Sequence, residues 1–356
     1  MHQMPLRIGL LGCGTIAQFA HLPALERAVG VEMKAICDGR EDLLNAIGAR
    51  FAGTRLYTDC GEFLQDDGID AVLIAVPDVL HVPLATQALR AGKHVLVEKP
   101  LGSNSSECER LCELVETTNL TLQVGSMKRH DPGIAFAAEF IRARLGEILS
   151  VSAWYRDSLF RGEMQKAILP MVIGSNSTTS SVADAKTSDR RHYSLVTHGA
   201  HLFDTIRYLS GEVINVSACL AEKFDQYSWH GMFQLESGAA GNFELSVKVN
   251  GDFEEGYTVQ GTHGSVAIRT FLPFYCRSSE VRAFDGRTQE WHVPLGANSN
   301  PYKNQLEAFA QSVLKGKAAN PNEMDGLAAV RLLEAVEESA ASGNRINLMP
   351  SKIEAV

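Results

Sequence analysis

The sequence contains no long uninterrupted run of apolar residues. A transmembrane helix needs about 20 such residues, whereas the stretch from Ala71 to Val76 has only the length of a buried strand. The N-terminus has no basic segment before its short apolar stretch and no small-residue cleavage site. We therefore expect neither a signal peptide nor insertion into a membrane.

Positive charge is also scarce, and cysteines are few. The 33 Lys and Arg residues are outnumbered by 42 Asp and Glu residues, so the formal net charge is −9. Such a chain lacks the basic surface that binds nucleic acid or an anionic membrane, and a small molecule is the expected partner. The seven cysteines form no Cys-x-x-Cys pair, and an odd number cannot pair fully within one chain. Reduced thiols predict a cytoplasmic protein.

The chain of 356 residues is long enough for two domains, and its first third alternates short apolar runs with helical patterns. This alternation is typical of βαβ units around a parallel sheet. The predicted strands are Leu6–Leu11, Val31–Cys37, Ala71–Val76, His94–Val97 and Thr121–Val124. Helices are predicted at Glu41–Phe51, at Val82–Ala91 and after Asn104, which has the spacing of a capping box with Glu107.

Beyond Gly125, strand patterns follow one another with few helices between them, which predicts a mainly antiparallel sheet. The predicted strands are Ser150–Tyr155, Val213–Glu222, Ser228–Leu235, Ala240–Val249, Tyr257–Gln260 and Ser265–Ile268. The predicted helices are Ile134–Arg144, Thr197–Leu209, Asn304–Leu314 and Glu323–Ser342. We thus expect an α/β protein with a doubly wound parallel sheet in residues 1–124. Residues 125–356 are expected to form an α+β domain with a large, mainly antiparallel open sheet.

A glycine-rich turn directly follows the first predicted strand. Gly12, Gly14 and Ala17 have the Gly-x-Gly-x-x-Ala spacing of dinucleotide-binding turns, with Thr15 and Ile16 between the last two. The first glycine permits the tight turn, the second lets a pyrophosphate approach backbone amides, and the alanine allows close packing of helix on strand. Because the N-terminus of the following helix favours negative phosphates, the sequence predicts a dinucleotide site.

An acidic residue closes the second predicted strand. Asp38 comes 21 residues after Ala17, where a dinucleotide-binding fold places the carboxylate that binds the adenosine ribose. A carboxylate repels the 2′-phosphate of NADP, so NAD is the expected cofactor. Arg40 is a cation two residues later that could accept this phosphate, and NADP therefore stays the alternative.

Further motifs follow later strands and helices. They are Ala75-Val-Pro77-Asp-Val-Leu-His81, Glu98-Lys99-Pro100, Lys128-Arg129-His-Asp-Pro132, His198-Gly199-Ala-His201-Leu-Phe-Asp204 and Asn304-Gln-Leu-Glu-Ala-Phe309. In this order, together with the glycine turn, they resemble the glucose-fructose oxidoreductase and inositol dehydrogenase family (Gfo/Idh/MocA). The resemblance covers nearly the whole chain.

This resemblance implies an N-terminal Rossmann domain and a C-terminal domain with an open sheet, with nicotinamide and substrate held between them. It also implies a homodimer or homotetramer built through that sheet. Beyond the glycine turn, Asp38 and Arg40, the implied cofactor contacts are Pro77, His81, Glu98 and Lys99. A cis peptide bond between Lys99 and Pro100 is implied as well.

The implied chemistry gives two residues distinct roles. Oxidation of a carbinol requires a base within hydrogen-bond reach of the hydroxyl, and histidine titrates near neutral pH. The resemblance implies that His201 is this acid/base and that Lys99 is the cation that steadies the developing alkoxide. Most family members have an acid four residues before this histidine. Here that residue is Thr197, which can hydrogen-bond but cannot offset the charge of an imidazolium.

Candidate substrate contacts are polar or planar side chains, which suit hydroxyl-rich rings. They are Lys99, Arg129, Arg156, Asp157, Thr197, His198 and His201. His198 is expected to face the substrate only if its helix begins late, because neighbouring helical residues point about 100° apart. The spacing of His198, His201 and Asp204 also suits one helix face, but no second group of ligands accompanies them, so no metal is predicted. The long connection from Asp157 to Ser194 is expected to exclude water from the site or to brace a neighbouring subunit.

The expected function is an NAD-dependent dehydrogenase, or a reductase in the reverse direction. Its expected substrate is a secondary hydroxyl of a sugar, sugar derivative or cyclitol. Two alternatives stay open: an enzyme with tightly bound NAD that cleaves glycosides through transient oxidation, and a non-catalytic regulator that senses dinucleotides. The presence of Lys99 and His201 favours an enzyme.

Overall fold

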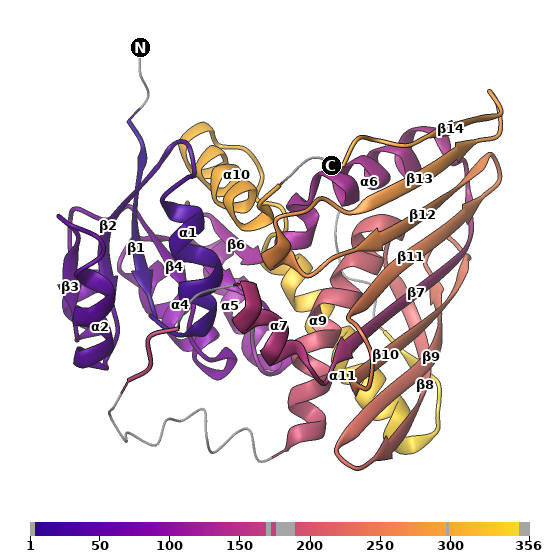
Figure 1. Ribbon diagram of the computed structural model, residues 1–356, viewed down its shortest axis with the longest axis horizontal. Coiled ribbons are helices and arrows are strands. Elements are labelled where there is room, and N and C mark those ends of the chain that lie inside the picture. The colour runs from indigo at the N-terminus through magenta and orange to yellow at the C-terminus, as the bar shows by residue number, and fades with distance from the viewer. Residues whose placement is uncertain (1–3, 169–171, 176–188, 297–298, 349–356) are drawn as a thin grey trace. The chain divides into compact units, whose positions relative to one another are not determined.

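The computed structural model describes residues 4–168, 172–175, 189–296 and 299–348 (Figure 1). The chain forms two compact units, and it passes back into the first unit twice. The first unit contains the described residues of 1–127, 169–188 and 302–327, and the second contains those of 128–168, 189–301 and 328–356. The predicted division into residues 1–124 and 125–356 stays a prediction.

The first unit is built on a six-stranded parallel sheet. Its strands are β1 (Leu6–Leu11), β2 (Val31–Cys37), β3 (Arg55–Tyr57), β4 (Ala71–Ile74), β5 (His94–Glu98) and β6 (Leu122–Gly125). The strand order is β3-β2-β1-β4-β5-β6, which is the order of dinucleotide-binding folds and confirms the predicted doubly wound sheet. The predictions omit β3, because it has only three residues and none of them is buried.

Most helices of the first unit connect these strands, and one comes from later in the chain. A π-helical turn (Ala17–His21) runs into α1 (Leu22–Leu25), and the later helices are α2 (Glu41–Gly48), α3 (Cys60–Leu64), α4 (His81–Arg90), α5 (Ser105–Glu116) and α10 (Pro301–Lys315). The predicted capping box begins α5. The Asn104 side chain accepts a hydrogen bond from the Glu107 amide at 2.9 Å, and the Glu107 carboxylate accepts one from the Asn104 amide at 3.2 Å.

The second unit contains a nine-stranded sheet. Its strands are β7 (Ile148–Ser158), β8 (Val213–Lys223), β9 (Gln226–Leu235), β10 (Ala240–Val249), β11 (Glu254–Gly261), β12 (Gly264–Thr270), β13 (Glu280–Asp285), β14 (Glu290–His292) and β15 (Ile346–Asn347). They lie in the order β14-β13-β12-β11-β7-β10-β9-β8-β15. Of these neighbours, only β7 and β10 pair in parallel, so the predicted mainly antiparallel sheet is confirmed.

Helices α6 (Pro132–Arg144) and α9 (Arg190–Ser210) pack on this sheet, and α7 (Arg161–Ile168) follows β7. Helix α9 also packs against α11 (Glu323–Ser342), where a Cβ atom at Gly199 would come within 2.7 Å of the Leu333 side chain. The long predicted connection is thus partly helical, because α7 and the first turn of α9 lie within it. Residues 169–171 and 176–188 of this connection lie outside the described residues.

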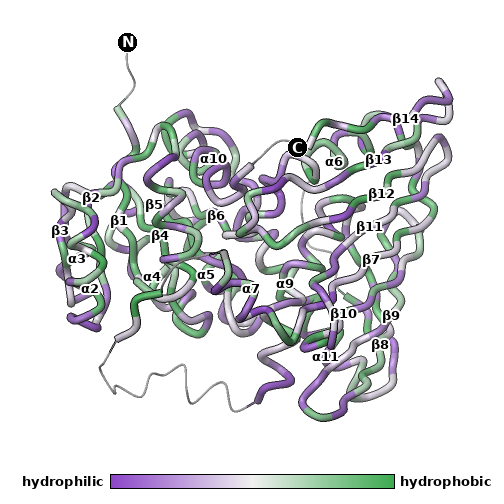
Figure 2. The backbone as a smooth tube through the Cα atoms, in the orientation of Figure 1, coloured by the Kyte–Doolittle hydropathy of each residue, from purple (hydrophilic) through white to green (hydrophobic). Residues whose placement is uncertain are grey.

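Buried and more exposed residues alternate along most of strand β7, and Figure 2 colours the strand by the hydropathy of its residues. Val151, Ala153 and Tyr155 are each 1% exposed and belong to the core of the second unit. Because successive side chains point to opposite faces, Asp157 lies on the same face as Tyr155, whereas Arg156 lies on the other. Within the described ranges, no helix combines the length and the hydropathy that crossing a membrane requires.

Candidate functional site

The glycine turn after β1 has two glycines with different roles. Gly12 has a φ of +101°, and a Cβ atom there would lie 2.4 Å from the carbonyl oxygen of Ala75. Gly14 has no atom within 4 Å of the place where its Cβ would stand. Gly12 is therefore required by the fold, whereas Gly14 leaves open space beside the first helical residues, Thr15 and Ile16. Their amides belong to the first turn and lack helical partners, so this turn fits a pyrophosphate.

The carboxylate of Asp38 faces this turn and is 7% exposed. It accepts hydrogen bonds from the Cys13 amide at 2.8 Å and from Arg40 through its amide, Nε and Nη2 at 2.9, 2.9 and 2.8 Å. Burial acts to raise the pKa of Asp38, but the hydrogen bonds from Arg40 and Cys13 outweigh it and hold the pKa below its usual value. Asp38 is thus an anion at the end of β2, with Arg40 folded against it.

Pro77 and His81 follow β4. The buried His81 ring has Nδ1 2.7 Å from the Pro100 carbonyl oxygen and Nε2 3.0 Å from that of Val76. Burial lowers the pKa of His81. The neutral ring has one N–H, so it donates to one of these two carbonyl oxygens while packing between the segments after β4 and β5. This buried position gives His81 a structural role.

Glu98 and Lys99 end β5. Glu98 is buried, and its Oε2 accepts a hydrogen bond from the Lys99 amide at 3.0 Å. Lys99 itself is half-buried. The peptide bond from Lys99 to Pro100 is cis, as the resemblance implies.

In the second unit, Tyr155 is the centre of a polar cluster that also contains Asp157, Arg161 and His198. The Tyr155 hydroxyl lies 3.2 Å from Nη1 of Arg161 and 3.3 Å from Nδ1 of His198. Asp157 accepts a hydrogen bond from Arg161 at 2.6 Å, and its other oxygen lies 3.8 Å from Nε2 of His198. Burial raises the pKa of Asp157, against the opposing charge of Arg161.

A buried cation lies over the Tyr155 ring. Nζ of Lys128 is 5.0 Å from the ring centroid and forms an ion pair with Glu255. Burial lowers the pKa of Lys128, although Glu255 opposes this effect. The cluster thus gathers hydrogen-bond donors and acceptors around a Tyr155 ring that is itself buried.

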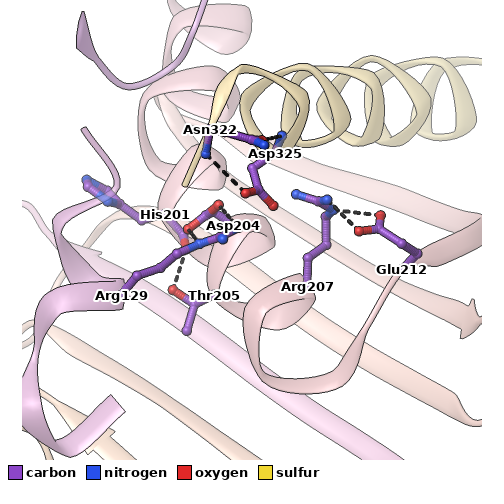
Figure 3. Close-up of polar contacts among 8 residues, drawn as sticks. All are labelled: Arg129, His201, Asp204, Thr205, Arg207, Glu212, Asn322 and Asp325. Atoms are coloured by element: carbon purple, nitrogen blue, oxygen red, sulfur yellow. Dashed lines mark hydrogen bonds and ion pairs between the residues drawn. The ribbon is translucent and has the colours of Figure 1, made fainter. Parts of the chain in front are cut away.

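His201 lies beside the same tyrosine. Its ring is nearly parallel to that of Tyr155, with an interplanar angle of 8° and a centroid distance of 6.3 Å. Thr197 lies one helical turn before His201 on α9, and Thr205, one turn after it, donates a hydrogen bond to the His201 carbonyl oxygen at 2.9 Å (Figure 3). Tyr155 therefore contacts both His198 and His201. We expected His198 to reach the site only if its helix began late, but α9 begins early, at Arg190.

Two predicted substrate contacts form ion pairs of their own. Arg129 forms a buried ion pair with Asp204, with Nε and Nη2 at 3.0 and 2.7 Å from its oxygens (Figure 3). Arg156 lies on the opposite face of the sheet from Tyr155 and binds Glu244 and Glu254, each at 2.7 Å. The structure does not bring Arg156 to the cluster, and it occupies Arg129 with a partner of its own.

The sequence predictions select Arg156 and Asp157 from this strand and omit Tyr155 and Arg161. The alternation of β7 was a signal that separates Arg156 from Tyr155 and Asp157, because every second residue shares a face. No comparable signal marks Arg161, which reaches the cluster from α7. Among the described residues, no group of three or more His, Cys, Asp or Glu side chains is arranged to hold a metal ion.

Comparisons with known proteins agree with this architecture. The family model described as "Oxidoreductase family, NAD-binding Rossmann fold" matches residues 6–126, and its "C-terminal alpha/beta domain" matches residues 189–348. An inositol 2-dehydrogenase of Rhizobium meliloti is 27% identical, and the alignment covers 97% of this chain and 100% of that protein. A D-xylose 1-dehydrogenase (NADP(+)) of Haloferax volcanii is also 27% identical, over 96% of this chain and 100% of its own.

Solved structures show the same fold. A levoglucosan dehydrogenase in complex with NADH and levoglucosan superposes with a TM-score of 0.79 at 22% identity, covering 97% of this chain and 99% of that one. The matches to both family domains confirm the resemblance that the sequence motifs indicate. The chain belongs to the Gfo/Idh/MocA family of NAD(P)-dependent oxidoreductases.

Proposed function

We propose that this protein is an NAD-dependent dehydrogenase that oxidises a secondary hydroxyl of a sugar, sugar derivative or cyclitol, or reduces the corresponding ketone. The observation that carries this proposal is the cluster around Tyr155, which gathers His198, His201 and Asp157 on one face of the second unit. Relatives named for inositol and D-xylose support the class of substrate.

The proposed cofactor is NAD, with Gly12, Gly14, Thr15 and Ile16 holding its pyrophosphate. When bound, the nicotinamide supplies the acceptor for a hydride. Asp38 is proposed to bind the adenosine ribose, and its negative charge disfavours a 2′-phosphate. Pro77, Glu98 and Lys99 are proposed to complete the cofactor contacts. Because one relative is named for NADP(+), the test below includes NADP as the alternative cofactor.

His201 is the proposed acid/base, which takes the proton of the substrate hydroxyl at a ring nitrogen. Lys99 is the proposed cation that lowers the pKa of that hydroxyl and stabilises the alkoxide as charge develops. Thr197 can orient a substrate hydroxyl by hydrogen bonding, but it carries no charge. Asp157 and His198 are proposed to bind further hydroxyls, since both present polar atoms beside Tyr155.

The first test follows the absorbance of reduced nicotinamide with NAD and NADP in parallel, across aldoses, glycosides, sugar acids and inositols. We expect turnover with one group of substrates and a preference for NAD. Lys99→Ala and His201→Ala are expected to reduce kcat about 10²–10⁴-fold while the Kd for NADH changes little.

Three outcomes would contradict parts of this proposal. Unchanged rates in either variant would remove the role given to that residue. Product formed without net reduction of NAD would indicate glycoside cleavage through transient oxidation. Tight NAD binding with no turnover on any substrate would favour a dinucleotide sensor.

A homodimer or homotetramer is also proposed, and light scattering coupled to gel filtration tests it.

A further inference from the structure

His21 and Glu98 form a buried hydrogen-bonded pair in the first unit. The His21 Nε2 atom lies 2.8 Å from Oε1 of Glu98, and their side chains are 0% and 7% exposed. The two residues are 77 positions apart in the sequence. His21 ends the π-helical turn after the glycine motif, and Glu98 ends β5. The tertiary structure therefore links the glycine turn to the strand that precedes Lys99.

The second oxygen of Glu98 holds the backbone of Lys99. Its Oε2 accepts the Lys99 amide hydrogen at 3.0 Å, at the point where β5 has ended. The next residue, Pro100, has no amide hydrogen to donate. A backbone N–H without a partner is unfavourable. The carboxylate of Glu98 therefore accepts the hydrogen bond that a carbonyl oxygen of a neighbouring strand would accept within the sheet.

The ring of His21 has one orientation that serves this contact. No hydrogen-bond partner within the described structure reaches its Nδ1, so its hydrogen bond runs through Nε2. The edge of the ring packs against Tyr302 at a centroid distance of 5.3 Å and an interplanar angle of 82°. Because Glu98 accepts at both of its oxygens, Nε2 of His21 is the donor.

Charge supports the same arrangement. Burial acts to raise the pKa of Glu98, but the hydrogen bond and attraction of His21, together with the charge of Lys99, outweigh it and lower the pKa. Glu98 is therefore an acceptor at both oxygens. The π-helical turn that presents His21 is itself uncommon, and such turns occur frequently at functional sites.

We propose that His21 is a positioning residue for Lys99. It fixes the carboxylate of Glu98, which fixes the Lys99 amide and hence the direction in which the Lys99 side chain leaves the backbone. This inference rests on the proposed role of Lys99 in turnover. His21 and Glu98 contact neither the substrate nor the reacting atoms in this proposal.

Two amide substitutions make a matched pair for the test. In His21→Gln, the side-chain nitrogen reaches about as far as Nε2 and can still donate to Glu98. In His21→Asn, the nitrogen stops near the position of Nδ1 and cannot reach it. We expect His21→Asn to reduce kcat about 10²-fold, a loss that a misplacement of about 1 Å can cause, and His21→Gln to retain most of the wild-type rate.

The pH dependence of kcat separates positioning from general damage to the fold. If Lys99 moves away, its charge no longer lowers the pKa of the substrate hydroxyl, so the apparent pKa for turnover rises. We expect His21→Asn to shift this apparent pKa upward, in the same direction as Lys99→Ala, and His21→Gln to leave it in place. A loss of rate with an unshifted profile, or equal losses in both variants, would overturn the inference.

Hydrogen exchange provides a measurement that does not depend on turnover. Peptides that cover residues 94–101 are expected to exchange faster in His21→Asn than in wild type or His21→Gln, because the Lys99 amide loses its fixed acceptor. Equal exchange in all three proteins would refute the positioning role even if the wild type proved inactive. An inactive wild type with the expected exchange pattern would instead contradict only the proposed function. Should His21→Asn fail to fold, His21→Leu, which fills the space but has no donor for Glu98, replaces it in both measurements.

Discussion

Arg40 folds back onto Asp38 and donates three hydrogen bonds to it, through its amide, Nε and Nη2. The Cys13 amide donates a fourth. A carboxylate has about four lone-pair sites, so Asp38 is fully occupied while Arg40 stays in this position. A ribose hydroxyl can bind Asp38 only after the Arg40 side chain has moved. If the proposed NAD binds here, Arg40 competes with its ribose and, once displaced, is a cation available to a 2′-phosphate.

This competition predicts the effect of Arg40→Ala on cofactor choice. The variant should bind NADH as well as or better than wild type and bind NADPH about tenfold more weakly, since a hydrogen bond to a charged group contributes about 1.5–3 kcal/mol. Fluorescence titration with NADH and NADPH measures both Kd values, and Arg50→Ala serves as a control that removes an arginine elsewhere in the unit. An equal change for both cofactors would exclude a role for Arg40 in selection.

The two glycines of the turn should respond differently to alanine. Gly12→Ala places a Cβ against Ala75 at a φ of +101°, and such strain costs on the order of 1–3 kcal/mol in the free energy of unfolding. Gly14→Ala meets no atom within 4 Å. It should leave stability within about 0.5 kcal/mol and weaken NADH binding at least about tenfold. Urea unfolding and NADH titration of both variants measure these effects. Normal NADH binding by Gly14→Ala would disprove the role of Gly14 in holding the pyrophosphate.

The buried pair of Arg129 and Asp204 predicts a stability effect. Arg129→Ala leaves Asp204 as a buried charge without its partner, and breaking such a pair costs about 3–5 kcal/mol. The double variant Arg129→Met with Asp204→Leu removes both charges and should recover much of this loss. Denaturant unfolding measures the two variants. A raised KM in Arg129→Ala with an unchanged free energy of unfolding would instead indicate that Arg129 contacts the substrate.

Tyr155 offers a test of the polar cluster. Tyr155→Phe keeps the ring beside His201 but removes the hydroxyl that Arg161 and His198 contact. We expect the KM for the substrate to rise about tenfold with little change in the Kd for NADH. Arg156→Ala, on the other face of β7, is the matched control and should leave KM unchanged. The same increase in both variants would argue against a substrate role for this face.

The thiol of Cys13 predicts a dependence on pH. Burial, and next the charge of Asp38, raise the pKa of Cys13 to about 12. Only the thiolate reacts with iodoacetamide, so at pH 8 only about one Cys13 in 10⁴ is reactive, whereas exposed Cys219 is accessible. Mass spectrometry of labelled peptides should find Cys219 modified at pH 8 and Cys13 modified only as the pH approaches 12. Rapid labelling of Cys13 at pH 8 would contradict its buried state.

Elements whose signals are local could be predicted from the sequence. Strands β1 and β2 agree with their predicted ranges to the residue, and the capping box at Asn104 forms as expected. The glycine turn, with Asp38 at the end of β2, could likewise be predicted, because turn chemistry and strand periodicity depend on residues close together in the chain. Strand β3 could not be predicted, because it is short and lacks buried residues.

The partners of several charged side chains were decided by the tertiary structure alone. Arg129 pairs with Asp204, which lies 75 residues later in the sequence, and His21 pairs with Glu98, 77 residues later. The sequence determined that Arg129, Lys99 and His201 are present and that each lies near the end of a strand or on a helix. Which carboxylate neutralises Arg129, and which ring lies beside His201, follows from packing between distant segments. Hydrophobic burial drives that packing without regard to the order of residues in the chain.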